Sequence, residues 1–211
     1  MTKIYKEYHT CSWLNYDRVI MLSFYGRYKD IRNATWQVLI DFNITSIPVS
    51  VTAIARAADI LVVKNSEVNE LKSNEAGVSI SNRGEWYIVY DDSMARGCIR
   101  FTIAHELGHI FLGHLLTVGY HARTVNASKP GVEREADIFA SRLLMPACVI
   151  WGLNIHTAKD IQDVFDVSYT DAEIRAERMQ ILYERNRFLT SPLEKRVYDR
   201  FESYIKANRR V

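Results

Sequence analysis

The feature that most constrains the chain is the pentapeptide His105-Glu106-Leu107-Gly108-His109, inside a stretch, RFTIAHELGHIFLGHLL, whose pattern predicts one continuous helix. Residues four apart lie on one face of a helix, so both imidazoles can bind one Zn²⁺ while Glu106 reaches water at the metal. Apolar residues surround the histidines, and a buried imidazole or carboxylate without a partner would be costly. We therefore predict a zinc hydrolase site rather than an amphipathic helix carrying solvated histidines.

A catalytic zinc ion normally takes three protein ligands and leaves the fourth position open. His114 is the nearest further histidine, but it follows the second histidine of the pentapeptide by five residues, whereas the extended H-E-x-x-H-x-x-G-x-x-H pattern needs a separation of six. A helix continuing through Leu115 would also point His114 away from the metal. We expect His114 to be exposed or to support the site from behind, and His121 and His156 to be surface histidines.

A better third ligand lies downstream, in residues 131–146 (GVEREADIFASRLLMP), which also have helical spacing and end at a proline. Glu133 and Asp137 are four residues apart at the edge of a predicted apolar stripe. One carboxylate can therefore bind the metal while the other accepts the second N–H of a ligating histidine. Small alanines in the stripe would let this helix approach the first closely. We predict Glu133 as the third ligand, with Glu135, expected to be a solvated charge, as the alternative.

These two segments together resemble the ImmA/IrrE family of zinc metallopeptidases, and the resemblance extends to about residue 180. It implies a compact metallopeptidase core with a small sheet beside the helix that carries the zinc histidines. Matched residue by residue, His105 and His109 correspond to the metal histidines and Glu106 to the catalytic glutamate. Glu133 corresponds to the glutamate ligand, while the family's glutamate next to an alanine matches Glu135, which keeps that alternative open. The resemblance also implies an intracellular peptidase that cleaves a helix-turn-helix transcriptional repressor and so relieves repression.

Composition agrees with an enzyme of one domain, because a chain of 211 residues that is 48% hydrophobic can bury a sizeable core. The fold class we expect is α+β: a helix-rich, single-domain, zincin-like metallopeptidase with a small antiparallel or mixed sheet beside the H-E-x-x-H helix. Residues 1–180 would form the metallopeptidase domain, and residues 181–211 a helical C-terminal extension.

Cysteine usage and the N-terminal sequence predict a cytoplasmic protein. The three cysteines, Cys11, Cys98 and Cys148, are far apart and odd in number, which argues against disulfides. We see no apolar segment able to act as a signal peptide, and no run long enough to span a membrane. A membrane partner is therefore not expected.

The remaining pattern predicts the elements that hold the site. The expected helices cover residues 16–28 and 48–58, with Ser50 or a neighbour capping the second, and the expected strands cover residues 59–64, 77–81 and 85–90. Asn82-Arg83-Gly84 would form the hairpin turn between the last two strands. The strand at 85–90 leads into the H-E-x-x-H helix, so a sheet edge there could hold an extended peptide by main-chain hydrogen bonds; the alternative is a hairpin that only covers the core.

A second class of function is a regulator that binds DNA or protein without proteolysis. Residues 160–168 and 169–178 have the outline of two helices joined by a tight turn, as in DNA-binding helix-turn-helix proteins. The second of these carries three acids beside two arginines: Asp171, Glu173, Glu177, Arg175 and Arg178. The acids would face phosphate, and a net charge of +2 is too small to argue for nucleic acid. We therefore predict a structural helix pair and no direct nucleic-acid binding.

Overall fold

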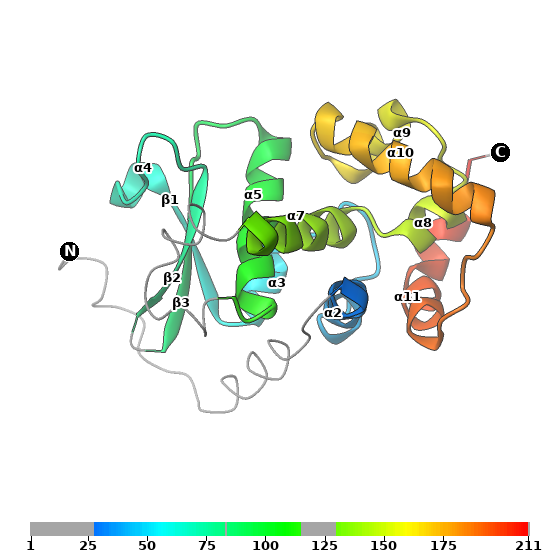
Figure 1. Cartoon of the computed structure of the whole chain (residues 1–211), viewed down its shortest axis with the longest axis horizontal. Helices are drawn as coiled ribbons and strands as arrows, with labels where there is room; N and C mark the ends of the chain where they lie inside the picture. The colour runs from blue at the N-terminus through cyan, green and yellow to red at the C-terminus, as the bar shows by residue number, and fades with distance from the viewer. Residues whose placement is uncertain (1–27, 83, 115–129, 211) are drawn as a thin grey trace.

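The structure is a computed structural model that describes residues 28–82, 84–114 and 130–210. These residues form an α+β fold in which a small sheet lies at one end and a group of helices at the other. Helix α7 (Pro130–Leu144) reaches between the two ends (Figure 1). The predicted helix-rich, single-domain α+β architecture is confirmed.

The sheet contains β1 (Ile60–Lys64), β2 (Gly77–Asn82) and β3 (Glu85–Tyr90), in the order β1-β3-β2. Strand β3 pairs in parallel with β1 and antiparallel with β2, so the sheet is mixed. The three predicted strands are confirmed, and Gly84 adopts a φ of +87° in the hairpin turn, where a side chain would be strained. The expectation that β3 offers a sheet edge is wrong, because β3 is paired on both sides; among the described strands, β2 is the free edge next to the H-E-x-x-H helix.

One side of the sheet is covered by α3 (Val51–Ala57) and α5 (Arg96–Phe111) (Figure 1). The predicted cap of α3 is confirmed, since the Ser50 hydroxyl accepts a hydrogen bond from the Ala53 N–H. A short helix, α4 (Asn65–Val68), follows β1. The sequence reading did not identify α2 (Tyr28–Asp41), although the buried residues Ile31, Ala34 and Val38 recur in it at helical spacing. The predicted helix at 16–28 lies outside the described residues apart from its last position.

Helix α5 ends earlier than the sequence predicted. It stops at Phe111, and Gly113, with a φ of 72°, reverses the chain before His114. The expectation of a helix through Leu115 is therefore wrong. Helix α7 packs closely on α5, as predicted from its alanines: a side chain at Gly108 would meet the Ala136 backbone at 3.3 Å.

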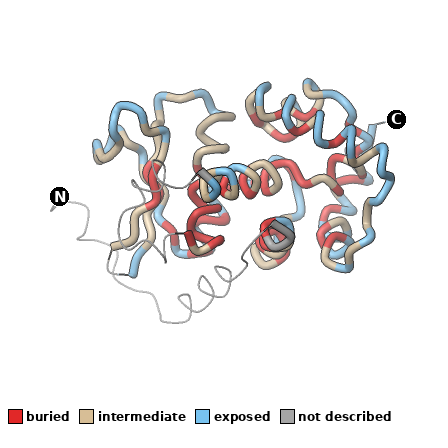
Figure 2. Tube along the Cα trace, in the orientation of Figure 1, coloured by how far each residue is buried: buried red, intermediate tan, exposed pale blue. Residues whose placement is uncertain are grey.

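The other end of the molecule consists of α8 (Ala147–Gly152), α9 (Ala158–Phe165), α10 (Tyr169–Arg185) and α11 (Pro192–Asn208). Helix α11 packs on α2 and α8 through its buried Val197, Phe201 and Ile205. Figure 2 shows buried residues where α5 and α7 meet and along the inner faces of these C-terminal helices. The division of the chain at residue 180 stays a prediction; α10 runs through that position as one helix. None of the described helices is long and apolar enough to cross a membrane.

Candidate metal centre

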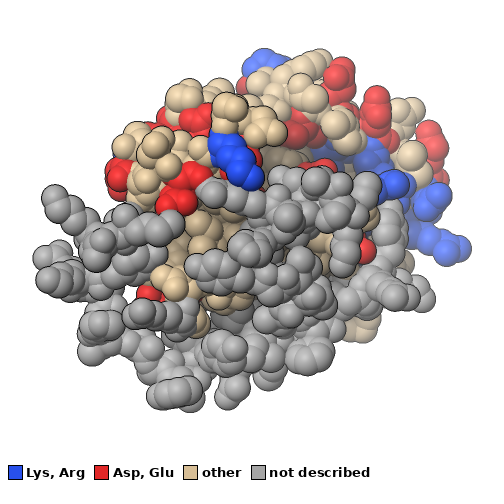
Figure 3. All heavy atoms as spheres, turned by 60° about the vertical axis from the view of Figure 1, so that its left-hand side comes forward, with Lys and Arg blue, Asp and Glu red and all other residues tan. Residues whose placement is uncertain are grey.

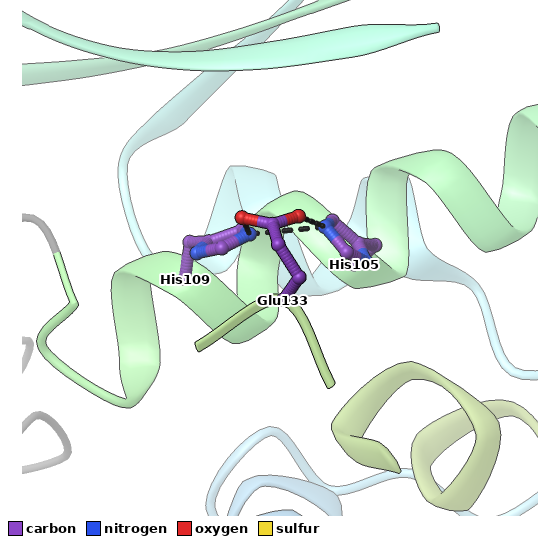
Figure 4. A group of neighbouring side chains, drawn as sticks. All are labelled: His105, His109 and Glu133. Atoms are coloured by element: carbon purple, nitrogen blue, oxygen red, sulfur yellow. Dashed lines mark hydrogen bonds and ion pairs between the residues drawn. The ribbon is translucent and has the colours of Figure 1, made fainter. Parts of the chain in front are cut away.

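Two helices bring three potential metal ligands together. Helix α5 presents His105 and His109 on one face, with 2.9 Å between their Nε2 atoms. Helix α7 places Glu133 against both: Oε2 lies 3.3 Å from His105 Nε2, and Oε1 lies 3.5 Å from His109 Nε2 (Figure 4). The three ligand atoms lie within 4.8 Å of one another. Glu133, not Glu135, is thus the carboxylate that the structure brings to the two histidines.

Asp137 holds the outer side of His105. One turn along α7 from Glu133, its Oδ1 lies 2.9 Å from His105 Nδ1, where an N–H can donate to it. This is the hydrogen bond predicted from the four-residue spacing of the two carboxylates. Burial alone would lower the pKa of His105, but hydrogen bonds to Asp137 and Glu133 and the charge of Glu106 raise it to about 10. Burial alone would raise the pKa of Glu133, but its interactions with His105 and His109 outweigh burial and lower that pKa to about 2.

Glu106 is buried and has a partner on the sheet. The Ser79 hydroxyl of β2 lies 2.6 Å from Glu106 Oε2 and donates to it. Ser79 is itself only 1% exposed. Ser79 was not predicted from the sequence. The alternation of a strand shows which residues point inward, but not which of them will contact a residue 27 positions later in the chain.

His114 does not point away from the site, as the longer helix would have required, but supports it from behind, the second of the two places expected for it. After the turn at Gly113 it folds back onto the site, and its Nδ1 lies 3.1 Å from Nδ1 of His109. Its Nε2 lies 3.1 Å from Oε2 of Glu135, which is therefore paired rather than simply solvated. Burial and the neighbouring His109 lower the pKa of His114 to about 4. His156 is exposed, as predicted, and His121 lies outside the described residues.

The donor set fits a cation. Two imidazole nitrogens and one carboxylate form the His₂Glu combination found in catalytic zinc sites. Glu133 Oε1 is buried; it lies 3.5 Å from His109 Nε2, but no donor among the described residues makes a hydrogen bond to it. Within the described part of the chain, this is the one group of three His, Cys, Asp or Glu residues whose ligand atoms meet in this way. A shared cation would satisfy the carboxylate oxygen and explain the close approach of the two ring nitrogens.

The family profile described as the IrrE N-terminal-like domain, Peptidase_M78, matches residues 56–177. The chain belongs to the ImmA/IrrE peptidase family. The match covers more than half of the chain and contains the sheet, α5 and α7, and hence all of the residues that build this centre.

Other comparisons are more distant. A solved structure described as a Mycobacterium tuberculosis transcriptional regulator resembles the chain with a TM-score of 0.49 and 14% sequence identity, over 75% of this chain and 50% of that one. The chain thus spans about half the length of that protein. Among curated proteins, no sequence matches.

The helix pair α9 and α10 packs against the rest of the fold. Arg175, one of the two arginines considered for DNA contact, is buried and donates two hydrogen bonds to the Met145 carbonyl, at 2.9 and 2.6 Å. The turn between the helices lies on α5, where Arg96 and Arg100 bind Asp166. Figure 3 shows acidic and basic side chains together on one face of the described surface. These contacts support the structural interpretation over DNA reading.

Proposed function

We propose that the protein is a zinc-dependent endopeptidase in which His105, His109 and Glu133 hold the metal and Glu106 is the general base. The observation that carries this proposal is the meeting of two imidazole nitrogens and an unsatisfied carboxylate oxygen from two separate helices. When bound, zinc lowers the pKa of water and polarises the substrate carbonyl. Membership of a peptidase family supports the choice of a peptide bond as the substrate.

Glu106 supplies the proton transfer in this proposal. Its carboxylate would accept a proton from the attacking water and return it to the leaving amine. Because Ser79 holds Oε2, we assign the transfer to the other oxygen of the carboxylate. Burial of Glu106 keeps the surroundings of this carboxylate low in dielectric, which strengthens its interaction with nearby positive charge.

Strand β2 is the proposed binding edge for the substrate backbone. It is one of the two edge strands of the described sheet, contacts α5 and carries Ser79. An extended peptide paired with β2 would gain main-chain hydrogen bonds of the kind used in strand addition. Such binding selects an extended segment rather than a chain terminus, which suits an endopeptidase.

The substrate class we propose is a helix-turn-helix transcriptional repressor, in the cytoplasm, so that cleavage relieves repression. This assignment rests on the family resemblance. The repressor encoded nearest to the gene is therefore the natural first candidate. Direct DNA binding is not proposed, because Arg175 is buried in the core and the turn of the helix pair is covered by α5.

The decisive experiment is co-expression of that repressor with the wild-type protein or with Glu106→Gln. The amide is nearly isosteric and removes no metal ligand, but it cannot accept a proton, so we expect full zinc content and no cleavage. His156→Gln, at an exposed histidine far from the centre in sequence, is the control and should cleave normally. If Glu106→Gln relieves repression as well as wild type while the repressor stays full length, catalysis is not the function.

A further inference from the structure

His109 has a second ring nitrogen that points away from the proposed metal. While its Nε2 faces His105 and Glu133, its Nδ1 lies 3.1 Å from Nδ1 of His114. His114 in turn places its Nε2 3.1 Å from Oε2 of Glu135. Three side chains therefore form a row that leads from the ligand candidate His109 to a half-exposed carboxylate on α7.

The row admits one consistent placement of protons if His109 binds the metal, a condition that rests on the proposed function. A ligating Nε2 must offer its lone pair, so the proton of the neutral ring sits on Nδ1. That N–H can donate to His114 only if His114 Nδ1 is unprotonated. The proton of neutral His114 is then on Nε2, where the Glu135 carboxylate accepts it. Every nitrogen in the row thus has a defined role.

The backbone fixes His114 in this place. The turn at Gly113 brings its main-chain N–H to the carbonyl of His109, at 3.0 Å, so both main chain and side chain of His114 contact the same residue. The side chain is 8% exposed, which shields its hydrogen bond to His109 from competition by water. Helix α7 therefore reaches both histidines of α5 from behind: Asp137 contacts His105 directly, and Glu135 reaches His109 through His114.

We propose that His114 and Glu135 are positioning residues that fix the ring orientation and the tautomer of His109 and so raise the metal affinity of the centre. Neither residue would bind the metal itself. Outer partners of ligating histidines contribute roughly 10- to 100-fold in metal affinity. The same loss is expected when His114 can no longer accept the proton of His109.

The first test measures zinc affinity of the full chain by competition with a chromophoric chelator. His114→Phe keeps an aromatic ring but has no acceptor, and should weaken zinc binding by roughly 10- to 100-fold. His114→Asn can place a carbonyl oxygen near the position of Nδ1 and accept the same proton, so it should restore most of the affinity. His156→Phe, at an exposed histidine, is the matched control and should bind like wild type.

The second test separates a positioning pair from general packing. Glu135→Ala should weaken zinc binding in the same direction as His114→Phe, and the double variant should lose little more than the larger single loss, because both changes interrupt one row. The visible spectrum of the Co²⁺-substituted protein should change in His114→Phe and return towards wild type in His114→Asn. Circular dichroism and thermal unfolding of the metal-free proteins identify any variant that fails to fold; Glu135→Ala, at a half-exposed site, then decides the question.

The possible outcomes separate the positioning role of His114 from the proposed zinc-peptidase function on which it rests. A folded wild-type protein with no zinc affinity would overturn both. Tight binding by wild type with equal affinity in His114→Phe would overturn the positioning role alone. So would an Asn variant as weak as the Phe variant, or fully additive losses in the double variant.

Discussion

Ser79 donates a hydrogen bond to the Glu106 carboxylate, with 2.6 Å between Ser79 Oγ and Glu106 Oε2. Both residues are buried, and they come from different elements: Ser79 from the edge strand β2 and Glu106 from α5. The bond ties the proposed base to the strand that we propose holds the substrate backbone. In the proposed function, one strand would therefore both hold the substrate backbone and orient the base.

Ser79→Ala should slow cleavage without removing zinc. A hydrogen bond to a charged group is worth about 1.5–3 kcal/mol, and even about 1.4 kcal/mol of lost positioning corresponds to a tenfold lower rate. The measurement is the time course of repressor cleavage, with zinc content determined on the same samples. Ser81→Ala, two positions along the same strand, is the control and should cleave normally. If Ser79→Ala cleaves the repressor at the wild-type rate, Ser79 does not contribute to the mechanism.

Alanine substitutions should separate the ligands from their neighbours. His105→Ala, His109→Ala and Glu133→Ala each delete one of three proposed ligands and should leave far less than one zinc per chain after dialysis. Glu135→Ala should retain about one zinc per chain at saturating metal, with weaker affinity, because it deletes no ligand. Elemental analysis of each purified variant measures the zinc bound per chain. Loss of zinc from Glu135→Ala with retention in Glu133→Ala would reverse the assignment.

The pattern of the site was predictable from sequence where it depends on helical spacing. His105 and His109, and likewise Glu133 and Asp137, are each one turn apart, so their shared faces follow from the geometry of a helix. The strands and their hairpin followed from alternation and from Gly84 in the turn.

Contacts between separate elements were not predictable in the same way. His114 was assigned to a continuing helix, because the apolar run after His109 shows no break; only the positive φ of Gly113 turns it back. Ser79 and the central position of β3 depend on how strands are ordered in the sheet, which alternation does not encode. Helix α2 was missed although its apolar spacing is present in the sequence.

Zinc binding should release a proton from His105. In the metal-free protein the pKa of His105 is raised from 6.5 to about 10, so the ring is charged near pH 7 and must lose its proton to bind a metal. The stabilisation that this charge gives the metal-free fold is complete below about pH 6.5 and is lost as the pH rises through about 10. Zinc affinity should accordingly rise with pH across this window.

Calorimetry in buffers of different ionisation enthalpy measures the protons released per zinc. Asp137→Asn removes a charge that raises the pKa of His105, so this variant should release fewer protons near pH 7. Equal proton release by the variant and wild type would show that Asp137 does not hold His105 in its charged form.

Two glycine substitutions test whether the turn between α9 and α10 is packed tightly against α5. A Cβ at Gly97, near the start of α5, would lie 2.8 Å from backbone atoms of Val167 and Ser168 in the turn between α9 and α10. Gly97→Ala should therefore destabilise the metal-free protein by about 1–3 kcal/mol, because rigid backbone must shift. At Gly131, near the start of α7, a Cβ would have no atom of the described residues within 4 Å, so Gly131→Ala should be neutral or stabilise by up to about 1 kcal/mol through its helix propensity. Urea denaturation measures both free energies of unfolding. A Gly97→Ala protein as stable as wild type would mean that the pair is not held against α5, and its turn would then be free to meet a partner.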